Sequence, residues 1–316
     1  MSSFRSIGDV VDRIIREWLY PPDARETIIT IPSTLTDTAT TVPYDLNFLL
    51  PEELDAIGEG TLLELGLESI IVGEVDEDND QFLNVIRGAR GTTPTPHNAN
   101  TQAIVEPAYS RLAVFNAIAD TCTSLSPSLH TIRSFEMEVS RNGNEPPFSL
   151  IVPYHFTYYD ASGNPRRASV AYYPHFAPSP TNSIVMVQGV PSGTSGYLVY
   201  QSSVPRPLAL SDTFDDLGIN PSWELLIIIG ALASLISGYD ISRATEHHIA
   251  KLLDQEQGAR TTGSRIRDSL LSYYGFLLSR ARADLLSRQG VTINRSFPAS
   301  TMQHAMGHHQ HPIPID

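Results

Sequence analysis

The stretch NVIRGARGTTPTPHNANT (residues 84–101) packs two Arg-Gly pairs, adjacent threonines, two prolines and a histidine between two apolar segments. Three interpretations compete: a phosphate-binding loop, a catalytic loop and a structural turn. A Walker-type phosphate loop requires the pattern G-x-x-x-x-G-K-[ST], and this stretch has neither the lysine nor the spacing. The stretch is therefore predicted to be a structural crossing from a strand into a loop.

Each residue type in the stretch has a structural task. Gly88 and Gly91 permit backbone conformations that other residues resist. Arg87 and Arg90 are expected to pair with carboxylates, either within the chain or across a subunit boundary. The remaining candidates, which are expected to satisfy loop groups locally or to complete the pattern, are Thr92, Thr93 and His97.

The sequence around this loop, from about residue 26 to 106, is typical of β-structure. Short runs rich in Ile, Val, Thr and Leu are separated by Gly, Pro, Asp and Asn. The acidic run DEDND (76–80) is predicted to be a hairpin tip, because the Gly and Glu of a calcium-binding EF-hand register are missing. Apolar residues at helical spacing in 107–129 predict a helix, with Cys122 packed on its apolar stripe. Residues 21–130 are thus expected to form a β-rich module with a closing helix.

The second half of the chain repeats the change from strands to helices. Residues 131–215 alternate apolar and polar side chains between regularly spaced turns, which predicts an antiparallel β-sandwich. Residues 216–290 predict a helical domain with segments at 222–238, 240–257 and 262–289. The last of these carries one apolar stripe, consisting of Ile266, Leu270, Tyr273, Leu277, Ala281 and Leu285.

The two ends of the chain have contrasting patterns. Residues 1–20 place Ile7, Val10, Val11, Ile14, Ile15 and Trp18 at helical spacing, so this amphipathic helix must dock on the chain or on a neighbour. Residues 291–316 have no periodicity and several prolines, which predicts an extended arm. The fold class is therefore α+β: a β-rich module and a helix, then an antiparallel β-sandwich, then a C-terminal helical bundle with an extended arm.

Composition excludes several classes of protein. The 316 residues carry a net charge of −14, which opposes general affinity for nucleic acid or an anionic membrane. The apolar run 225–238 is shorter than the roughly 18 residues of a membrane span, so a buried helix is expected. Acidic residues interrupt the N-terminal segment where a secretory signal has an apolar core. With one cysteine, an intramolecular disulfide is impossible, and a reducing cytosol suits folding.

Motifs that carry chemistry are missing from the sequence. It has no GxGxxG, HExxH, paired CxxC or GxSxG pattern. His247 and His248 are adjacent on a predicted helix and point about 100° apart, so they cannot share a metal ion. Gly193 and Gly196 are expected to let a loop turn. We therefore expect no enzymatic activity, no catalytic or metal-binding residues and no cofactor.

Three successive patterns in the chain resemble a recurrent module of tailed-bacteriophage virion proteins. The first is E-x-I-x-V, with Glu68, Ile70 and Val72 as its counterparts. The second is V-x-R-G-x-x-G-T-T with a later histidine, and its counterparts are Val85, Arg87, Gly88, Gly91, Thr92, Thr93 and His97. The third is L-x-P-x-L, and its counterparts are Leu125, Pro127 and Leu129. The later order of β-sandwich, apolar helix and Arg-rich helix is similar to head-to-tail connector (adaptor) proteins.

This resemblance implies a function. It implies a homo-oligomeric ring of about twelve copies, placed in the neck of the virion between the portal protein and the next neck or tail protein. DNA would pass non-specifically through an acidic channel, and no membrane is involved. Subunit or portal contacts are expected at Arg265, Arg267, Arg280, Arg282, Arg288, Arg295, Phe297 and Pro298, with the arm as a clasp.

Two alternatives remain open at this point. One is a tail or baseplate ring protein that uses the same β-module. The other is a carbohydrate-binding or receptor-binding virion protein, because the predicted sandwich is rich in tyrosine and aromatic faces stack on sugars. Tyrosine is also an ordinary strand-forming residue whose hydroxyl lies at the rim of a sheet.

Overall fold

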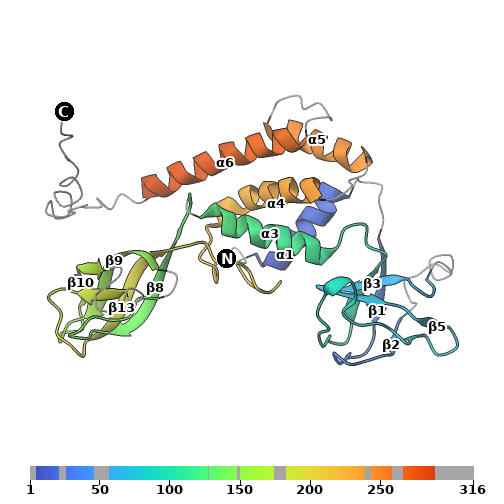
Figure 1. Cartoon of the computed structure of the whole chain (residues 1–316), viewed down its shortest axis with the longest axis horizontal. Coiled ribbons are helices and arrows are strands. Elements are labelled where there is room, and N and C mark those ends of the chain that lie inside the picture. Colours follow the sequence, from blue (N-terminus) through green and yellow to red (C-terminus); the bar gives the residue numbers. More distant parts are fainter. Residues whose placement is uncertain are drawn as a thin grey trace, which may run out of the picture.

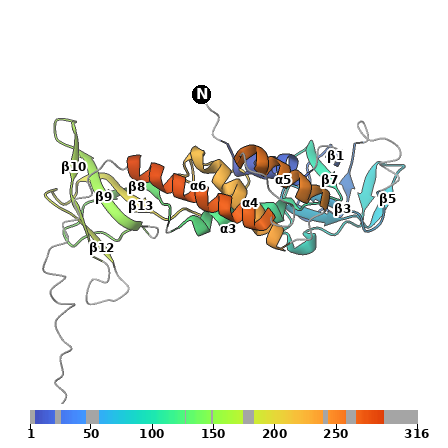
Figure 2. The same cartoon turned by 90° about the horizontal axis from the view of Figure 1, so that it is seen from above.

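The protein is an α+β structure in which a helical body lies between two β-lobes (Figure 1). Figure 2 shows the same elongated arrangement from above. This computed structural model describes residues 5–20, 26–45, 57–126, 128–147, 150–173, 183–238, 243–257 and 266–288. The predicted arm, residues 291–316, lies outside the described residues.

The helical body is assembled from three distant parts of the chain. These parts supply α1 (Ile7–Arg13), the π-helix η1 (Ile14–Leu19), α3 (Arg111–Leu125), α4 (Glu224–Gly238), α5 (Arg243–Gln257) and α6 (Ile266–Arg288). Ser6 begins α1 with a capping box, in which its hydroxyl accepts from the Asp9 N–H while the Asp9 carboxylate accepts from the Ser6 N–H. All six apolar residues predicted for the N-terminal stripe are buried, so this helix docks on its own chain.

The helix α3 belongs to the helical body. The sequence had assigned it to the β-rich module as a closing helix. Its apolar face, including Val114, Ile118 and Cys122, instead packs in the same core as α1 and α4. Adjacency in the sequence therefore did not determine the packing partners of α3.

The C-terminal helices follow the expected pattern closely. The run 225–238 is a buried helix, and a short 3₁₀ turn, η3 (Pro221–Trp223), precedes it. The predicted stripe of α6 faces the core, with Ile266, Leu270 and Ala281 buried and the other members partly buried. Among the described residues, no helix is long and apolar enough to cross a membrane.

The N-terminal β-lobe contains two small antiparallel sheets. One has the order β1-β7-β3-β4, formed by Thr27–Ile31, Thr101–Val105, Leu62–Leu65 and Glu68–Ile71. The other has the order β2-β6-β5, formed by Val42–Pro43, Gln81–Leu83 and Glu74–Asp76. The predicted hairpin at 76–80 is confirmed, because β5 and β6 pair across it and Asp76 accepts from the Asn79 N–H.

The second β-lobe contains a four-stranded and a two-stranded antiparallel sheet that share a small core. The larger has the order β10-β9-β13-β8, formed by Pro165–Ala168, Leu150–Tyr159, Ser195–Ser202 and Thr131–Glu138. The smaller pairs β11 (Val170–Tyr173) with β12 (Ile184–Val187). Phe156 and Leu198 of the larger sheet meet Val185 of the smaller one in the core.

Two details of this lobe bear on the sequence predictions. Gly193 has φ +89° in a turn, as expected, but Gly196 lies inside β13. A Cβ on Gly196 would lie 2.4 Å from the Thr157 carbonyl oxygen and 2.5 Å from the Phe156 ring, so close packing is what requires glycine there. The tyrosines of this lobe differ in exposure: Tyr200 is buried, whereas Tyr159, Tyr173 and Tyr197 are exposed.

Gly230 of α4 is predicted to be indispensable to the helical body. A Cβ at Gly230 would lie 2.5 Å from Thr121 Cγ2 on α3 and 2.9 Å from the Tyr274 ring on α6. Gly230→Ala is expected to lower the free energy of unfolding by about 1–3 kcal/mol, because the three helices must separate. Gly275→Ala on α6 meets nothing within 4 Å and should add about 0.5–1 kcal/mol through helix propensity. Urea unfolding followed by helical circular dichroism measures both, and equal effects would contradict the packing argument.

Candidate functional site

The loop at 84–101 is built around one buried carboxylate. Glu68 begins β4, and its side chain is completely buried. Arg87 forms a two-pronged ion pair with it, with Nε 2.6 Å from Oε1 and Nη2 2.8 Å from Oε2. Arg87 also donates to the carbonyl oxygens of Thr36 and Thr95. The expected pairing of Arg87 with a carboxylate within the chain is thus confirmed.

Further donors complete the shell of Glu68. The backbone N–H groups of Gly88 and Thr95 donate to its two oxygens at 3.2 and 3.0 Å. The Nε2 atom of His97 lies 2.8 Å from Oε2. Burial raises the pKa of Glu68, but hydrogen bonds from Arg87, Thr95 and His97 and the charge of Arg87 outweigh burial and bring the pKa to about 2. We call Glu68, Arg87, Gly88, Thr95 and His97 the Glu68 cluster.

The other predicted loop residues lie around this cluster. The Thr92 hydroxyl accepts from the Ser69 N–H and donates to the Ala89 carbonyl, as local satisfaction of the loop requires. Gly88 and Gly91 have φ of +65° and +78°, which confirms their conformational role. Arg90 and Thr93 are exposed, and Arg90 itself has φ +53°. Among the ion pairs of the described residues, none includes Arg90.

Glu68 had appeared in the sequence only as part of a pattern. Its partners follow it by 19 to 29 positions, and nothing in their spacing indicates that they surround one carboxylate. The available signal was an acidic residue at the start of a short strand whose burial is predicted by Ile70 and Ile71. Because a buried carboxylate needs a cationic partner, that signal could have been matched to Arg87.

Glu68 is predicted to make stability depend on acidity. Its pKa is lowered from 4.5 to about 2, so its contribution is present above pH 4.5 and is lost as the pH falls toward 2. The shift corresponds to about 3 kcal/mol. Urea titrations at pH 7 should show Glu68→Gln strongly destabilised, and the gap to the wild type should close toward pH 2. The control Glu77→Gln changes an exposed hairpin residue and should leave the pH profile within about 0.5 kcal/mol of the wild type. A gap that stays constant with pH would contradict the ion-pair account.

The two loop glycines are predicted to differ in tolerance. A Cβ on Gly88 would lie 2.7 Å from Pro94 Cδ and 2.9 Å from the Thr92 carbonyl oxygen, whereas a Cβ on Gly91 meets nothing within 4 Å. Gly91→Ala should therefore cost about 1–2 kcal/mol through its positive φ alone. Gly88→Ala should cost clearly more, because it adds overpacking beside the Glu68 cluster. The denaturant midpoints of the two variants measure these losses of stability. A larger loss for Gly91→Ala than for Gly88→Ala would contradict the overpacking argument.

A second buried carboxylate joins the N-terminal β-lobe to the helical body. Glu64 of β3 accepts from the Ser110 hydroxyl at 2.9 Å and from the Arg111 N–H at 2.9 and 3.0 Å. These donors form the first turn of α3, where a negative charge is favoured. Burial raises the pKa of Glu64, although its hydrogen bonds oppose this. The Arg111 guanidinium lies 2.5 Å from Asp12 of α1, so the joint reaches the N-terminal helix. Sequence reasoning missed Glu64 entirely.

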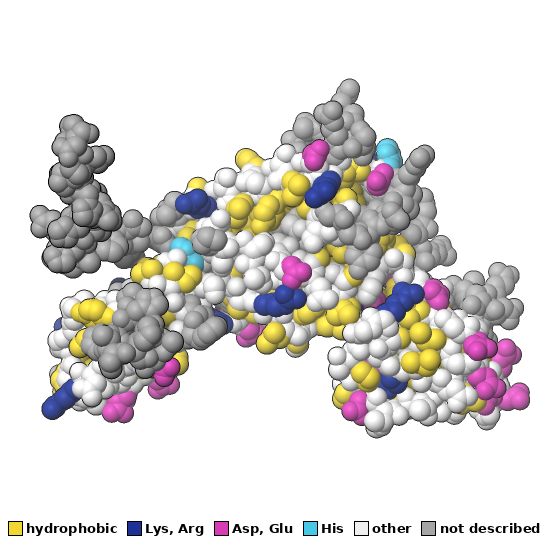
Figure 3. All heavy atoms as spheres, in the orientation of Figure 1, with side chains coloured by type: hydrophobic (Ala, Val, Ile, Leu, Met, Phe, Trp, Pro, Cys, Tyr) yellow, Lys and Arg dark blue, Asp and Glu magenta, His cyan; other side chains and the backbone are white. Residues whose placement is uncertain are grey.

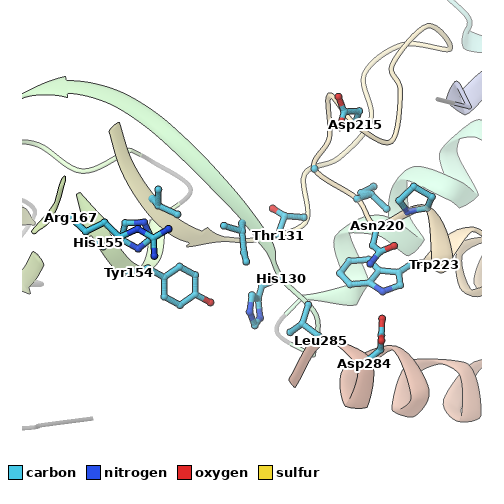
Figure 4. A pocket seen from close by; sticks show the side chains of 15 residues that line it. His130, Thr131, Tyr154, His155, Arg167, Asp215, Asn220, Trp223, Asp284 and Leu285 are labelled. Atoms are coloured by element: carbon cyan, nitrogen blue, oxygen red, sulfur yellow. The ribbon is translucent and has the colours of Figure 1, made fainter. Parts of the chain in front are cut away.

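A cavity of about 640 Å³ lies between the second β-lobe and the helical body (Figure 4). Its volume is within the range of small-molecule pockets. The sheet supplies Tyr154, His155 and Arg167 at one end, and the helical body supplies Trp223 and Asp284 at the other. His130 lies between them, where α3 leads into β8.

The electrostatics of the cavity are asymmetric. Burial lowers the pKa of His130, and burial together with the charge of Arg167 lowers the pKa of His155, so both rings are neutral at pH 7. Arg167 is then the permanent cation at the sheet end. Asp215 and Asp284 bring carboxylates to the other side. No sequence pattern pointed to this cavity, because its residues come from six separated segments.

The remaining predicted residues fall into three groups. Arg267, Arg280 and Arg282 are exposed on α6, where their availability for a partner stays a prediction. Arg265, Arg295, Phe297 and Pro298 lie outside the described residues, and so does the side chain of Arg288. Cys122 is buried, and burial raises its pKa to about 12, so it is a packed thiol as expected. Within the described ranges, no group of three His, Cys, Asp or Glu residues is arranged to hold a metal ion.

No protein-family model matches the sequence, and no curated protein matches it significantly.

Proposed function

We propose that this chain is a structural virion protein that forms a ring at the head-to-tail connector of a tailed bacteriophage, beneath the portal, and has no enzymatic activity. The ring, of about twelve copies in the proteins that the sequence resembles, would line a DNA channel and join the portal to the tail. The observation that carries the proposal is the Glu68 cluster. Residues of the virion-module pattern that are far apart in sequence meet there in one buried ionic arrangement.

The geometry of the cluster supports an architectural role for the pattern. A catalytic carboxylate needs access to substrate and a pKa near the working pH. Glu68 is completely buried, its pKa is about 2, and both of its oxygens are occupied by donors. Glu68 therefore holds the shape of the loop and is not available as a general base. Such a rigid loop suits a subunit whose task is assembly.

The distribution of charge is compatible with a channel. Acidic side chains gather at the far end of the N-terminal β-lobe, on the β5–β6 hairpin (Figure 3). Acidic walls repel phosphate and so let DNA slide without sticking. The exposed arginines of α6 lie on another part of the molecule and would serve contacts between subunits.

The position in the virion is tested by imaging. Purified particles containing this chain, labelled at its C-terminus, are examined by electron microscopy. The proposal expects label as a ring at the neck, between the capsid vertex and the tail. Label at a distal baseplate would replace it with the tail-ring alternative. Label on fibres would favour receptor binding, for which exposed Tyr159, Tyr173 and Tyr197 are the aromatic candidates.

The role of the α6 arginines is tested separately. The combined change Arg267→Glu, Arg280→Glu and Arg282→Glu should abolish ring incorporation and leave the helical circular dichroism unchanged, because all three side chains are exposed. Arg141→Glu alters an exposed arginine of the second β-lobe and is the control for charge alone. Incorporation of the triple variant at the wild-type level would exclude α6 from the subunit contact.

A further inference from the structure

The cavity between the second β-lobe and the helical body contains a buried donor without an acceptor. Trp223 is 3% exposed and lines the cavity, and among the described residues its Nε1 atom has no hydrogen-bond partner. A buried N–H that donates to nothing is costly, and buried indoles usually meet an acceptor. Trp223 therefore indicates that an oxygen acceptor from outside the chain completes this wall.

A carboxylate lies at the same end of the cavity. Asp284 of α6 lines it, and Figure 4 shows this side chain directed toward the Trp223 ring. An ionised carboxylate is an acceptor only, and its two oxygens offer about four acceptor positions, so it can take a further donor beside its other partners. A ligand group that fits this end therefore accepts from Trp223 and donates to Asp284.

This requirement selects among ligand groups. A ligand carboxylate cannot donate, and a ligand ammonium cannot accept. A secondary amide does both, because its carbonyl oxygen accepts while its N–H donates. Since the two functions of an amide sit on different atoms, it can serve both side chains fully. An amide is thus the group that suits this end of the cavity best.

The charges around the cavity favour a neutral ligand. Among the described residues that line it, Arg167 is the cation, whereas Asp215 and Asp284 supply two carboxylates. Burial lowers the pKa of both His130 and His155, so neither ring adds positive charge at pH 7. The net charge of the whole chain, −14, has the same sign as the two carboxylates. An anionic ligand would meet repulsion overall.

The sheet offers its face to the cavity and not an edge. Each of its four strands contributes to the lining: Arg167 from β10, His155 from β9, Val199 from β13 and Ile132 from β8. A peptide that extends a sheet forms its hydrogen bonds along an edge strand, so this face provides no backbone ladder for a peptide. The ligand must be recognised by side chains.

These side chains suit a ligand with many hydroxyl groups. The Tyr154 hydroxyl and the neutral rings of His130 and His155 each carry a donor and an acceptor, as a ligand hydroxyl does. Apolar side chains, including Val199 and Leu285, lie between them and can contact the C–H faces of sugar rings. A cavity of about 640 Å³ has room for more than a single small group.

We propose that this cavity binds a short neutral oligosaccharide that contains an N-acetylated amino sugar. The acetamido carbonyl accepts from Trp223 Nε1, and the acetamido N–H donates to Asp284. The sugar hydroxyls meet Tyr154, the two histidines and Arg167 toward the sheet. This inference stands on the cavity and does not depend on the virion proposal.

The first test follows the fluorescence of Trp223. The full chain has two tryptophans, and Trp18 is buried away from the cavity lining, so Trp18→Phe leaves Trp223 as the only tryptophan. Titration with N,N′,N″-triacetylchitotriose should change the emission of Trp223 saturably. Isothermal titration calorimetry on the unsubstituted protein measures the same affinity without any mutation. Absence of saturable binding in calorimetry would overturn the proposal.

Two further ligands test the role of the acetamido group. Cellotriose has the same linkages and a hydroxyl in place of each acetamido group, and it should bind about tenfold more weakly, because the Trp223 and Asp284 positions are then poorly matched. N-acetylglycinamide has the amide without the sugar and should also bind about tenfold more weakly. Equal affinity for the two trisaccharides would overturn the proposal. Equal affinity for N-acetylglycinamide would overturn it too, because the site would then recognise amides alone.

Two matched variants locate the site. Asp284→Ala should lower the affinity for triacetylchitotriose about tenfold, because the acetamido N–H loses its acceptor. Asp268→Ala removes an exposed carboxylate of the same helix that does not line the cavity, and it should leave the affinity unchanged. Helical circular dichroism checks that both variants fold. Equal affinities for the two variants would contradict binding at this cavity.

Discussion

The ion pair between Glu68 and Arg87 is the interaction on which the N-terminal β-lobe depends. Burying an ionised carboxylate without partners would cost several kcal/mol, which is comparable with the whole free energy of unfolding of a domain. Here the charge meets a two-pronged guanidinium, two backbone N–H groups and a histidine ring nitrogen. Because these donors come from both ends of the 84–101 loop, pairing the charge also fixes the path of the loop.

The β3–β4 hairpin carries a second buried carboxylate with a different task. Glu64 pairs in register with Ser69, and Glu68 with Leu65, so the two acidic side chains leave opposite faces of the hairpin. Glu64 meets the N–H and hydroxyl donors that begin α3, and burial raises its pKa. Glu68 meets a full positive charge, and its pKa falls. One short hairpin thus organises its own loop on one side and holds the helical body on the other.

The helical body joins the two β-lobes, because its core contains helices from the start, the middle and the end of the chain. Its core takes α1 from the start of the chain, α3 from between the lobes and α4 to α6 from the end. Each lobe has a smaller core of its own. The cavity lies where the second lobe meets this body, so its two ends differ in charge because they come from different structural units.

The sequence by itself determined the local elements and the class of fold. Helical and alternating periodicities reflect which side of an element faces the core, so the α1 and α6 stripes, the acidic hairpin and the buried run 225–238 were all predictable. The glycines of the loop were predictable as well, because positive φ is a local requirement. Tertiary structure alone decided that α3 joins the helical body, that Glu64 accepts hydrogen bonds from the start of that helix, and that Glu68 gathers Arg87 and His97. These contacts join residues far apart in the chain, and periodicity shows which residues face inward but not which inward faces meet.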